Sequence, residues 1–457
     1  MTARELARRV LERIDRDRAW ATPTLDGELA RAGLDDRDRR LASELVYGVL
    51  RHRARIDRAL GAHADLSRSP PRVVVALRVA AYQLLLLDRV PPYAAVDDAV
   101  GAARAVGGAK LAGFANAVLR KLGPGKEPPL PPPGPERIAA ESSLPRWIVD
   151  ELAAAVAGSA AVGDAGGAGD AGDAGGAGDA GGAGDAGDAG ETGEMGDEVA
   201  ARAAAFAQSA PLVARANRRR SSRAAVMELL ATAGATVRAI DVAPDALAID
   251  GLGDPSRSPS FAGGLWTVQD AGAQLVGIVA APRPGMRVLD ACAGVGGKST
   301  HLAELSDDRA TIDAADRSTT KLALGAETAK RLGHTSIRTV ACDLADPRAP
   351  IADAYDLIVL DAPCSGLGVL RRHPDAKWRL VASDVPRLAA VQAGLLDAVA
   401  HRLAPGGALV YSVCTFTRAE GPDQARAFAA RSGLRIVDER RTWPPDADAF
   451  YIARLER

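Results

Sequence analysis

Two cysteines that follow short apolar runs could supply nucleophilic chemistry to this chain. Residues 357–360 are apolar and branched, which predicts a buried strand, and Asp361 and Cys364 come within the next turn. Cys414 follows a second such run. Because reacting groups in parallel sheets gather at the carboxyl ends of the strands, we expect these three side chains to meet at one edge. A thiolate there could attack an electrophilic carbon, whereas the alternative is that both cysteines are small buried residues.

The segment after Cys364 is basic and aromatic, which suits contact with a nucleic acid. Cations bind phosphates, and aromatic rings stack on unpaired bases. The alternative interpretation is a solvated charged loop. The residues of this segment are Arg371, Arg372, His373, Lys377 and Trp378.

A glycine-rich turn earlier in the chain predicts a cofactor site. A strand ends at Asp290, and residues 293–298, AGVGGK, turn into a helix that begins near Ser299. Glycines let the backbone pass close to a ligand, and the unpaired amides of a helix N-terminus face it. Residues 297–299 could also end the phosphate-binding loop of a nucleoside triphosphatase, but Cys292 stands where that motif needs its first glycine.

Acidic residues after the next two strands favour a nucleoside ligand. Asp316 lies at or just past the end of the second strand, where a carboxylate can accept hydrogen bonds from both ribose hydroxyls. Asp343 follows the third strand, within reach of an adenine edge. Asp313 is the alternative for the ribose, and Asp290 is a candidate for ordering the loop.

Hydrophobic periodicity divides the chain into parts with different folds. Residues 1–123 have the apolar spacing of helices and are predicted to form an all-α domain. Residues 124–210 are predicted to be a linker with a helical segment and a disordered Gly/Asp/Ala insert at 158–198. Residues 211–270 have the pattern of a small α/β subdomain. Residues 271–457 alternate strands with helices, which predicts a doubly wound, mostly parallel Rossmann-like α/β sheet and makes the protein multidomain.

The charge of the chain is unevenly distributed. Its 57 Lys and Arg against 58 Asp and Glu leave a net charge of −1, but the insert holds ten acids and no base, so the remainder carries 57 − 48 = +9. This balance is compatible with a nucleic-acid partner. No apolar run approaches the roughly twenty residues of a membrane span, and no signal peptide is recognised, so we expect a cytoplasmic protein. Four scattered cysteines without a CxxC pair predict neither a disulfide framework nor a zinc site.

Several motifs together resemble known families that act on RNA. The helical region contains DRRLASELVYGVLR, LRVAAYQLLLLDRVPPYAAVDDAV and FANAVLR in that order, and it resembles the RNA-binding helical domain of the antitermination factor NusB. The C-terminal region contains LDACAGVGGKSTHLAEL, LDAPCSGLGVLRRHPDAKW and LVYSVCTFTRAE, and it is similar to S-adenosylmethionine-dependent RNA (cytosine-5)-methyltransferases of the RsmB/Sun type. The resemblance spans nearly everything except the Gly/Asp/Ala insert.

This resemblance implies a reaction in which a thiolate adds to carbon 6 of cytosine, so that carbon 5 can attack the methyl group of S-adenosylmethionine. It implies that Cys414 is the nucleophile and that Cys364 assists release of the enzyme. Asp361, if protonated, would suit proton donation to ring nitrogen 3. The residues implied in cofactor contact are Cys292, Ala293, Gly294, Val295, Gly296, Gly297, Lys298, Asp316, Asp343 and Asp361.

The chain departs from the family pattern at two places. Gly294 and Val295 stand where the family usually has alanine and proline, which we expect to loosen the cofactor loop. Residues 420–422, Glu-Gly-Pro, stand where the family usually has an acidic pair and an asparagine, so no role is carried over to them. For Cys342, and for the side chain of Cys292, a structural role is the favoured interpretation.

The implied substrate is small-subunit ribosomal RNA, bound by a monomer that needs no metal. Transfer RNA is the alternative substrate within the same enzyme class. A different class is a non-catalytic RNA-binding assembly factor whose altered glycine loop no longer holds cofactor. Binding of S-adenosylmethionine would separate this class from the enzymes.

Overall fold

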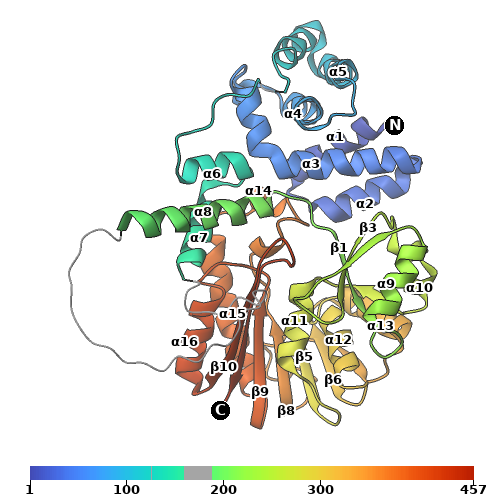
Figure 1. The fold of residues 1–457 in the computed structure, drawn as a ribbon, viewed down its shortest axis with the longest axis vertical. Helices are drawn as coiled ribbons and strands as arrows, with labels where there is room; N and C mark the ends of the chain where they lie inside the picture. Colours follow the sequence, from blue (N-terminus) through green and yellow to red (C-terminus); the bar gives the residue numbers. More distant parts are fainter. Residues whose placement is uncertain (125, 159–187) are drawn as a thin grey trace. The chain divides into compact units, whose positions relative to one another are not determined.

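A computed structural model describes residues 1–124, 126–158 and 188–457, which form two compact units (Figure 1). Unit 1 comprises Met1–Asp150, Gly196–Ser209 and Leu370–Leu380. Unit 2 comprises Glu151–Met195, Ala210–Val369 and Val381–Arg457. The short stretch from Leu370 to Leu380 therefore packs with the helical unit, although the sequence pattern assigned it to the catalytic region.

The N-terminal part of unit 1 is helical, as its apolar spacing predicts. Thr2 and Glu5 form a capping box at the start of the first helix, which satisfies backbone amides that have no partner within it. The buried faces share one core, which includes Leu6, Leu45 and Leu77. The helices are α1 (Ala3–Asp17), α2 (Ala21–Ala32), α3 (Asp36–Gly61), α4 (Pro71–Leu86) and α5 (Pro92–Leu119), with a 3-10 turn at Leu66–Arg68.

Two of these helices are interrupted. The backbone of α3 departs from helical geometry at His52, where φ is −108° and ψ is 17°. In α5 the interruption falls at Gly107 and Gly108, and Gly108 has a φ of 64°, which a residue with a Cβ adopts only at a cost. Both interruptions leave backbone groups near them free to take partners outside the helix.

The region between the helical domain and the small sheet is partly helical. Its helices are α6 (Pro135–Ser142), α7 (Arg146–Ala157) and α8 (Asp188–Phe206). The prediction of disorder over 158–198 is wrong at its C-terminal end, because α8 begins at Asp188 and continues into an apolar segment that includes the buried Val199, Ala203 and Phe206. Residues 159–187 of the predicted insert lie outside the described residues.

A small antiparallel sheet in unit 2 has the strand order β2-β3-β1-β4. Trp266 is fully buried beneath it with Val226 and Leu230 from its helix. The sequence pattern predicted this small α/β subdomain. Its elements are β1 (Leu212–Ala216), α9 (Arg223–Thr232), β2 (Thr236–Ala239), β3 (Ala246–Asp250), a 3-10 turn at Pro255–Arg257, α10 (Pro259–Ala262) and β4 (Trp266–Val268).

The large sheet of unit 2 has seven strands in the order β10-β11-β9-β8-β5-β6-β7. Strands β5 to β9 run parallel, whereas β11 pairs antiparallel with both β9 and β10. The mostly parallel Rossmann-like sheet is therefore confirmed. Its strands are β5 (Arg287–Ala291), β6 (Thr311–Asp316), β7 (Ile337–Ala341), β8 (Tyr355–Asp361), β9 (Leu403–Val413), β10 (Arg435–Thr442) and β11 (Phe450–Glu456).

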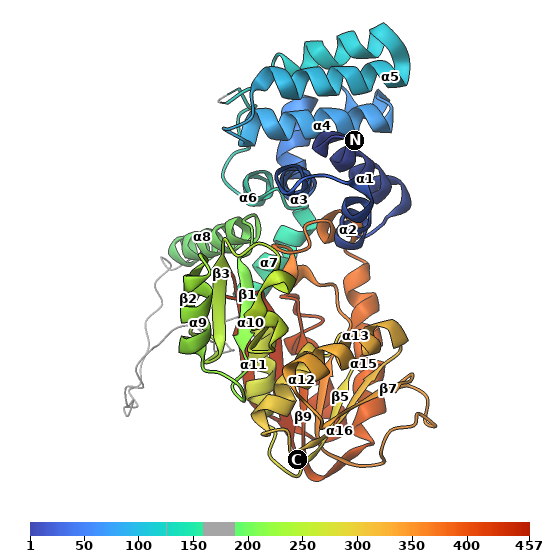
Figure 2. The ribbon, with the colours of Figure 1, turned by 90° about the vertical axis from the view of Figure 1, so that its right-hand side faces the viewer.

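Helices cover both faces of this sheet because alternate strand residues point to opposite sides (Figures 1 and 2). Leu357 and Val359 pack in the cluster that contains residues of α11 and α12, while Ile358 and Leu360 pack in the cluster that contains residues of α15 and α16. The helices of this region are α11 (Ala271–Ala280), α12 (Gly297–Leu305), α13 (Thr319–Leu332), α15 (Asp384–Ala400) and α16 (Pro422–Ser432), with a 3-10 turn at Leu367–Val369. The short helix α14 (Ala376–Arg379) belongs to unit 1.

The strand order reverses between β5 and β8. After β5 the chain adds β6 and β7 on one side, then returns to add β8 and β9 on the other. In an open parallel sheet, a ligand binds at the carboxyl ends of the strands at such a switch point. Within the described residues, no helix combines the length and apolar character needed to cross a membrane, and no cluster of three or more His, Cys, Asp or Glu side chains could hold a metal ion.

Candidate active site

The glycine-rich loop after β5 has the backbone geometry of a ligand cradle. Cys292, Gly294 and Gly296 all have positive φ angles, of 64°, 58° and 75°. The amide of Ala293 donates to the carbonyl of Ala315 at 2.9 Å. A Cβ built on Gly294 would meet only one backbone atom within 4 Å, the Cys292 carbonyl oxygen at 3.9 Å, so the space over the loop is open. This loop therefore leaves room for a ligand at the start of α12.

Asp316 holds the glycine-rich loop at the end of β6. Its Oδ2 accepts the Gly294 amide at 2.9 Å and its Oδ1 accepts the Ser318 amide at 2.8 Å. Asp313, the alternative for ribose binding, is buried and accepts the Tyr355 hydroxyl at 2.6 Å and Arg338 Nε at 2.8 Å. Asp313 is therefore engaged away from the loop, and Asp316 is the carboxylate at the cradle.

Asp343 lies after β7 in a more exposed position. Its Oδ1 accepts the amide of Ala345 at 3.0 Å, and its Oδ2 is 3.5 Å from Arg317. Its side chain is 44% exposed, so the carboxylate remains accessible to a ligand.

Lys298, the last residue of the glycine motif, forms an ion pair with Asp361 at the end of β8. Lys298 Nζ lies 2.6 Å from Asp361 Oδ2, and the hydroxyl of Ser412 on β9 donates to Asp361 Oδ1 at 2.9 Å. Burial acts to lower the pKa of Lys298, but attraction to and hydrogen bonding with Asp361 outweigh it, and the pKa is raised. The carboxyl group of Asp361 therefore accepts hydrogen bonds from residues at the ends of both neighbouring elements, α12 and β9.

Asp290 lies beneath the same loop as a fully buried carboxyl group. It accepts a hydrogen bond from the Ser299 hydroxyl, and burial raises its pKa to about 7. Its Oδ1 has no hydrogen-bond partner in the described part of the chain. The position is consistent with a role in ordering the start of α12.

The thiols of Cys364 and Cys414 lie 3.3 Å apart, sulfur to sulfur. The residues that follow them also meet, because the Ser365 and Thr415 hydroxyls are 3.0 Å apart. The hydrogen bond with Cys414, together with burial, raises the pKa of Cys364 well above its usual value. Cys364 is thus the thiol that keeps its proton, and Cys414 lies close enough to Lys298 for electrostatic attraction.

Glu420 organises the two cysteine turns and was assigned no role from the sequence. Its side chain is fully buried, and it accepts hydrogen bonds from the Ser365 amide at 2.8 Å and the Ser365 hydroxyl at 2.6 Å. Thr417 and Gln392 donate to the same carboxylate at 2.9 and 3.1 Å. In the sequence, Glu420 stands out only as an acidic residue a few positions after Cys414, and this alone does not indicate burial.

The small antiparallel sheet also supports the cofactor loop, through Arg215 on β1. This arginine is fully buried and forms an ion pair with Glu304 of α12 at 2.7 Å. Its Nη1 donates to the carbonyl of Gly297 at 3.1 Å. Arg215 thereby holds α12 at both its first and its last turn, which the sequence pattern of neither segment reveals.

The other two cysteines have environments that disfavour reactivity. Burial, followed by the nearby carboxylates, raises the pKa of Cys292 to about 12. Burial likewise raises the pKa of Cys342. Since the thiolate is the reactive form, these shifts agree with the structural roles favoured for them.

The predicted nucleic-acid contact through residues 371–378 is wrong for Arg371, Lys377 and Trp378. Arg371 and Lys377 are buried, and Trp378 packs against the helical core of unit 1. Buried cations cannot reach phosphates, so this segment has a different role.

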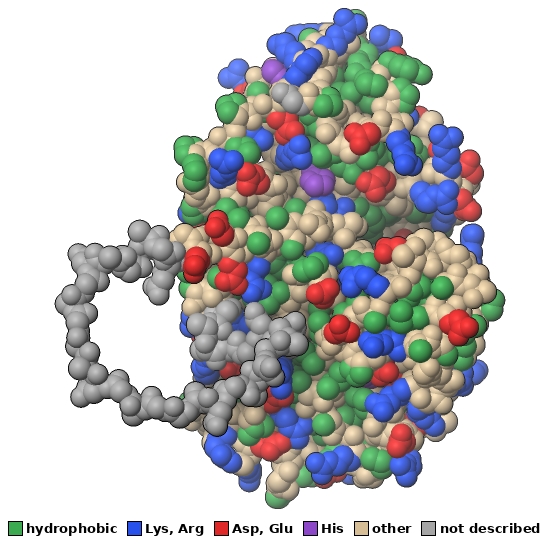
Figure 3. Space-filling model, viewed as in Figure 1, with side chains coloured by type: hydrophobic (Ala, Val, Ile, Leu, Met, Phe, Trp, Pro, Cys, Tyr) green, Lys and Arg blue, Asp and Glu red, His purple; other side chains and the backbone are tan. Residues whose placement is uncertain are grey.

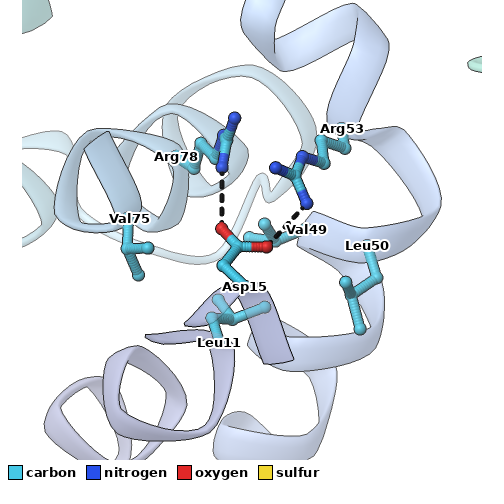
Figure 4. Close-up of a pocket in the computed structure, with 7 residues that line it drawn as sticks. All are labelled: Leu11, Asp15, Val49, Leu50, Arg53, Val75 and Arg78. Carbon is cyan, nitrogen blue, oxygen red and sulfur yellow. Dashed lines mark hydrogen bonds and ion pairs between the residues drawn. The ribbon is translucent and has the colours of Figure 1, made fainter. Parts of the chain in front are cut away.

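The arginines of α3 are likewise engaged within unit 1. Figure 4 shows Asp15 of α1 between Arg53 of α3 and Arg78 of α4, with N–O distances of 2.8 and 3.1 Å. Arg55 pairs with Glu127 at 2.5 Å. Arg53 and Arg55 are therefore held in ion pairs within unit 1.

Comparisons with known proteins agree with this architecture. Residues 277–456 match the family model of the 16S rRNA methyltransferase RsmB/F, residues 1–123 match the NusB family, and residues 193–254 match the RsmF/B-like ferredoxin-like domain. The chain is 34% identical to the probable ribosomal RNA small subunit methyltransferase B of Synechocystis sp., over 94% of this chain and 89% of that protein.

A second relative matches over almost its full length. The ribosomal RNA small subunit methyltransferase B of Pseudomonas putida is 32% identical, over 100% of this chain and 98% of that protein. The crystal structure of PH0851 is similar in fold, with a TM-score of 0.75 at 20% identity, over 100% of this chain and 99% of that one.

Proposed function

Because this chain belongs to the RsmB/F family of 16S rRNA methyltransferases, we propose that it methylates carbon 5 of a cytosine in small-subunit ribosomal RNA with S-adenosylmethionine. The observation that carries the proposal is the pair of thiols 3.3 Å apart beside the ion pair of Lys298 and Asp361. This chemistry needs one thiol to attack and a second group to assist release. Both are present at the carboxyl ends of β8 and β9.

Cys414 is the nucleophile in this proposal. Its sulfur adds to carbon 6 of the cytosine, and the electron pair displaced from the ring makes carbon 5 nucleophilic. Lys298 lies close enough to Cys414 for electrostatic attraction, and Cys364 can donate a hydrogen bond to the Cys414 sulfur. After carbon 5 has been methylated, its proton passes to water, the electron pair of that bond re-forms the double bond between carbons 5 and 6, and the bond between sulfur and carbon 6 breaks. Cys364 assists this release by donating its proton to the departing sulfur of Cys414.

Asp361 and Lys298 act together on the base. In the ion pair the proton resides on Lys298, and Asp361 accepts hydrogen bonds. The pair therefore offers both a donor for ring nitrogen 3 and an acceptor for the neighbouring amino group. Proton delivery to nitrogen 3 is thus routed through Lys298, with Asp361 as the orienting carboxylate.

The loop after β5 fits S-adenosylmethionine, which supplies an electrophilic methyl group when bound. The loop is open at Gly294, and in this proposal Asp316 accepts hydrogen bonds from the ribose hydroxyls while the accessible Asp343 contacts the adenine edge. Gly294 has a φ of 58°, so its amide reaches Asp316 in a backbone conformation that the alanine common in the family adopts at a cost. The glycine therefore suits the loop of this chain.

Replacing Asp316 by alanine is expected to weaken S-adenosylmethionine binding without unfolding the protein. The lost contact to ribose, charge-assisted on one side, should cost about 1.5 to 3 kcal/mol, or roughly ten- to a hundredfold in the dissociation constant. Calorimetric titration measures this change. Asp313→Ala is the matched control and should lower the melting temperature while leaving affinity near that of the wild type. An affinity loss confined to Asp313→Ala would contradict the assignment.

RNA binding is assigned to the unpaired cations of α5 and the loop after it. No Asp or Glu occurs at residues 99–126. Lys and Arg side chains lie at the end of the molecule that carries α5 in Figure 3, and their exposed charges form no ion pair within the described chain. A sequence-independent attraction to phosphates follows from such a surface. The residues are Arg104, Lys110, Arg120, Lys121 and Lys126.

Replacing Arg104, Lys110, Arg120 and Lys121 together by glutamine is expected to weaken RNA binding and flatten its salt dependence. Each lost phosphate contact should reduce the slope of log affinity against log salt by about 0.7 to 0.9. Filter binding of small-subunit ribosomal RNA fragments over a salt series measures the slope. Arg137→Gln, at an arginine paired with Glu141, is the control. An unchanged slope would contradict this assignment.

Two outcomes would redirect the proposal. No binding of S-adenosylmethionine by calorimetry would favour the non-catalytic assembly factor. Bisulfite sequencing of ribosomal and transfer RNA from a deletion strain would decide the substrate, because a 5-methylcytosine missing from transfer RNA alone would favour that class.

A further inference from the structure

The segment Leu370–Leu380 links the two cysteine turns to the helical domain through the chain itself. It packs within unit 1, while the residues directly before and after it belong to unit 2. Its lysine and tryptophan are adjacent in α14. Each donates a hydrogen bond to the interrupted part of α3.

The interruption of α3 at His52 exposes two pairs of backbone groups that a regular helix would join. The amides of Ala54 and Arg55 donate to the hydroxyl of Ser143, at 2.8 and 3.4 Å. The carbonyls of Leu50 and Arg51, four residues earlier, accept hydrogen bonds from the segment Leu370–Leu380. Trp378 Nε1 donates to the carbonyl of Leu50 at 2.6 Å, and Lys377 Nζ donates to that of Arg51 at 2.7 Å.

Lys377 is held more tightly than packing alone requires. Only 2% of it is exposed, and its ammonium donates to the carbonyls of both Arg51 and Ser143 at 2.7 Å. Burial, followed by the charge of Arg51, lowers its pKa to about 7. Because a buried ammonium needs acceptors for its hydrogen atoms, the position of Lys377 is tied to these two carbonyls.

Further contacts fix the rest of the segment. Asp375 Oδ2 accepts the amide of Ala21 at the start of α2, at 3.1 Å. Arg51 donates to the carbonyl of Arg371 at 3.1 Å, and Arg18 donates to that of Arg379 at 2.7 Å. The segment is therefore bonded to three helices of the N-terminal domain or the turns beside them.

The stretch just before this segment is bonded to the backbone of the nucleophile. The amide of Gly368 donates to the carbonyl of Cys414 at 3.0 Å, and its carbonyl accepts the amide of Ala449 at 3.0 Å. A Cβ at Gly368 would lie 1.9 Å from the Ala449 oxygen and 2.8 Å from the Cys414 oxygen, so only glycine fits. Val369 then leads directly into Leu370.

We propose that Lys377 and Trp378 are positioning residues that anchor this segment on the break of α3 and so hold the Cys364 and Cys414 turns in their reactive arrangement. The inference rests on the proposed function for its catalytic consequence. By it, the helical domain takes part in methyl transfer as well as in RNA binding. Loss of this anchor would displace residues 368–370 and, through them, both thiols.

The test uses the full-length variants Lys377→Met and Trp378→Phe, which remove the hydrogen bonds. The first keeps an unbranched side chain of similar length, and the second keeps an aromatic ring. Single-turnover methylation at saturating RNA should fall about ten- to a hundredfold, as for a misplaced reacting group, while the dissociation constant for S-adenosylmethionine stays within about twofold. Lys330→Met, at an exposed lysine on α13, is the matched control and should match the wild type.

A second readout is independent of methylation. Diamide oxidises two neighbouring thiols to a disulfide, so the rate of linking Cys364 to Cys414, followed by mass spectrometry, reports their separation. This rate should fall in both variants. Wild-type rates of linking in both variants would overturn the proposal, even if methylation fell. If Lys377→Met does not fold, Trp378→Phe decides by the same measurements. An inactive wild-type protein would refute the proposed function, and the linking rates would still decide the anchor.

Discussion

Replacing Cys414 by alanine is expected to abolish both methylated RNA and any covalent complex between protein and RNA. The attacking thiolate is lost, and no other described thiol except Cys364 lies within hydrogen-bonding distance of that sulfur. The turnover rate should fall on the order of 10⁴- to 10⁶-fold, as for removal of other catalytic nucleophiles. Labelled RNA with S-adenosylmethionine on a denaturing gel measures adduct and product together.

Cys364→Ala should fail in a different way. Attack and methyl transfer remain possible, but elimination slows, so the adduct accumulates as a shifted band that survives heating in detergent. The high pKa of Cys364 keeps its proton available at neutral pH, which suits release and not attack. The double variant should lose the band because no adduct forms.

The opposite result would reverse the roles of the two thiols. A band with Cys414→Ala and none with Cys364→Ala would mean that attack comes from the turn after β8. Cys342→Ala is the control for loss of a cysteine as such, since no role in the site is assigned to it and burial raises the pKa of its thiol. It should leave the covalent complex unaffected.

Replacing Glu420 by alanine is expected to destabilise unit 2 and remove activity together. Ser365, Thr417 and Gln392 would lose their shared acceptor inside the protein. Each buried donor left without its acceptor should cost about 1 to 3 kcal/mol of unfolding free energy. The turn that carries Cys364 would lose its anchor at the same time.

Thermal unfolding and adduct formation measure the two effects of Glu420→Ala. Glu420→Gln keeps one acceptor oxygen and should restore part of the stability. Glu327→Ala, at an exposed glutamate on α13, is the matched control and should resemble the wild type. A Glu420→Ala protein with wild-type stability and adduct yield would show that the network is dispensable.

Local pattern was sufficient to predict the elements of this protein. The helices of residues 1–123 and the strands of the C-terminal sheet follow from apolar periods of 3.6 and 2, which depend on near neighbours alone. The meeting of Cys364, Cys414 and Asp361 was also predictable, because parallel strands bring their carboxyl ends to one edge. The end of the insert was not, since residues 188–198 are poor in apolar side chains yet continue into the helix that buries Phe206.

Partners distant in sequence decided which of two similar residues belongs to the site. Asp313 and Asp316 stand on the same strand, and only the hydroxyl of Tyr355 from β8 decided that Asp313 points away from the cofactor loop. Glu420 became important because Ser365, 55 positions earlier, donates to it. No local pattern encodes such contacts.

The sequence by itself determined the helical domain, the parallel sheet and the chemistry at its edge, because these depend on periodicity, turn chemistry and residue type. Tertiary structure alone decided which charges are available. Lys377 is of a residue type that often contacts nucleic acids, yet it is buried and donates to the carbonyl of Arg51, 326 positions away. A charged side chain can solvate its charge with water, an acid or a backbone carbonyl, and only the folded chain determines which of these lies beside it.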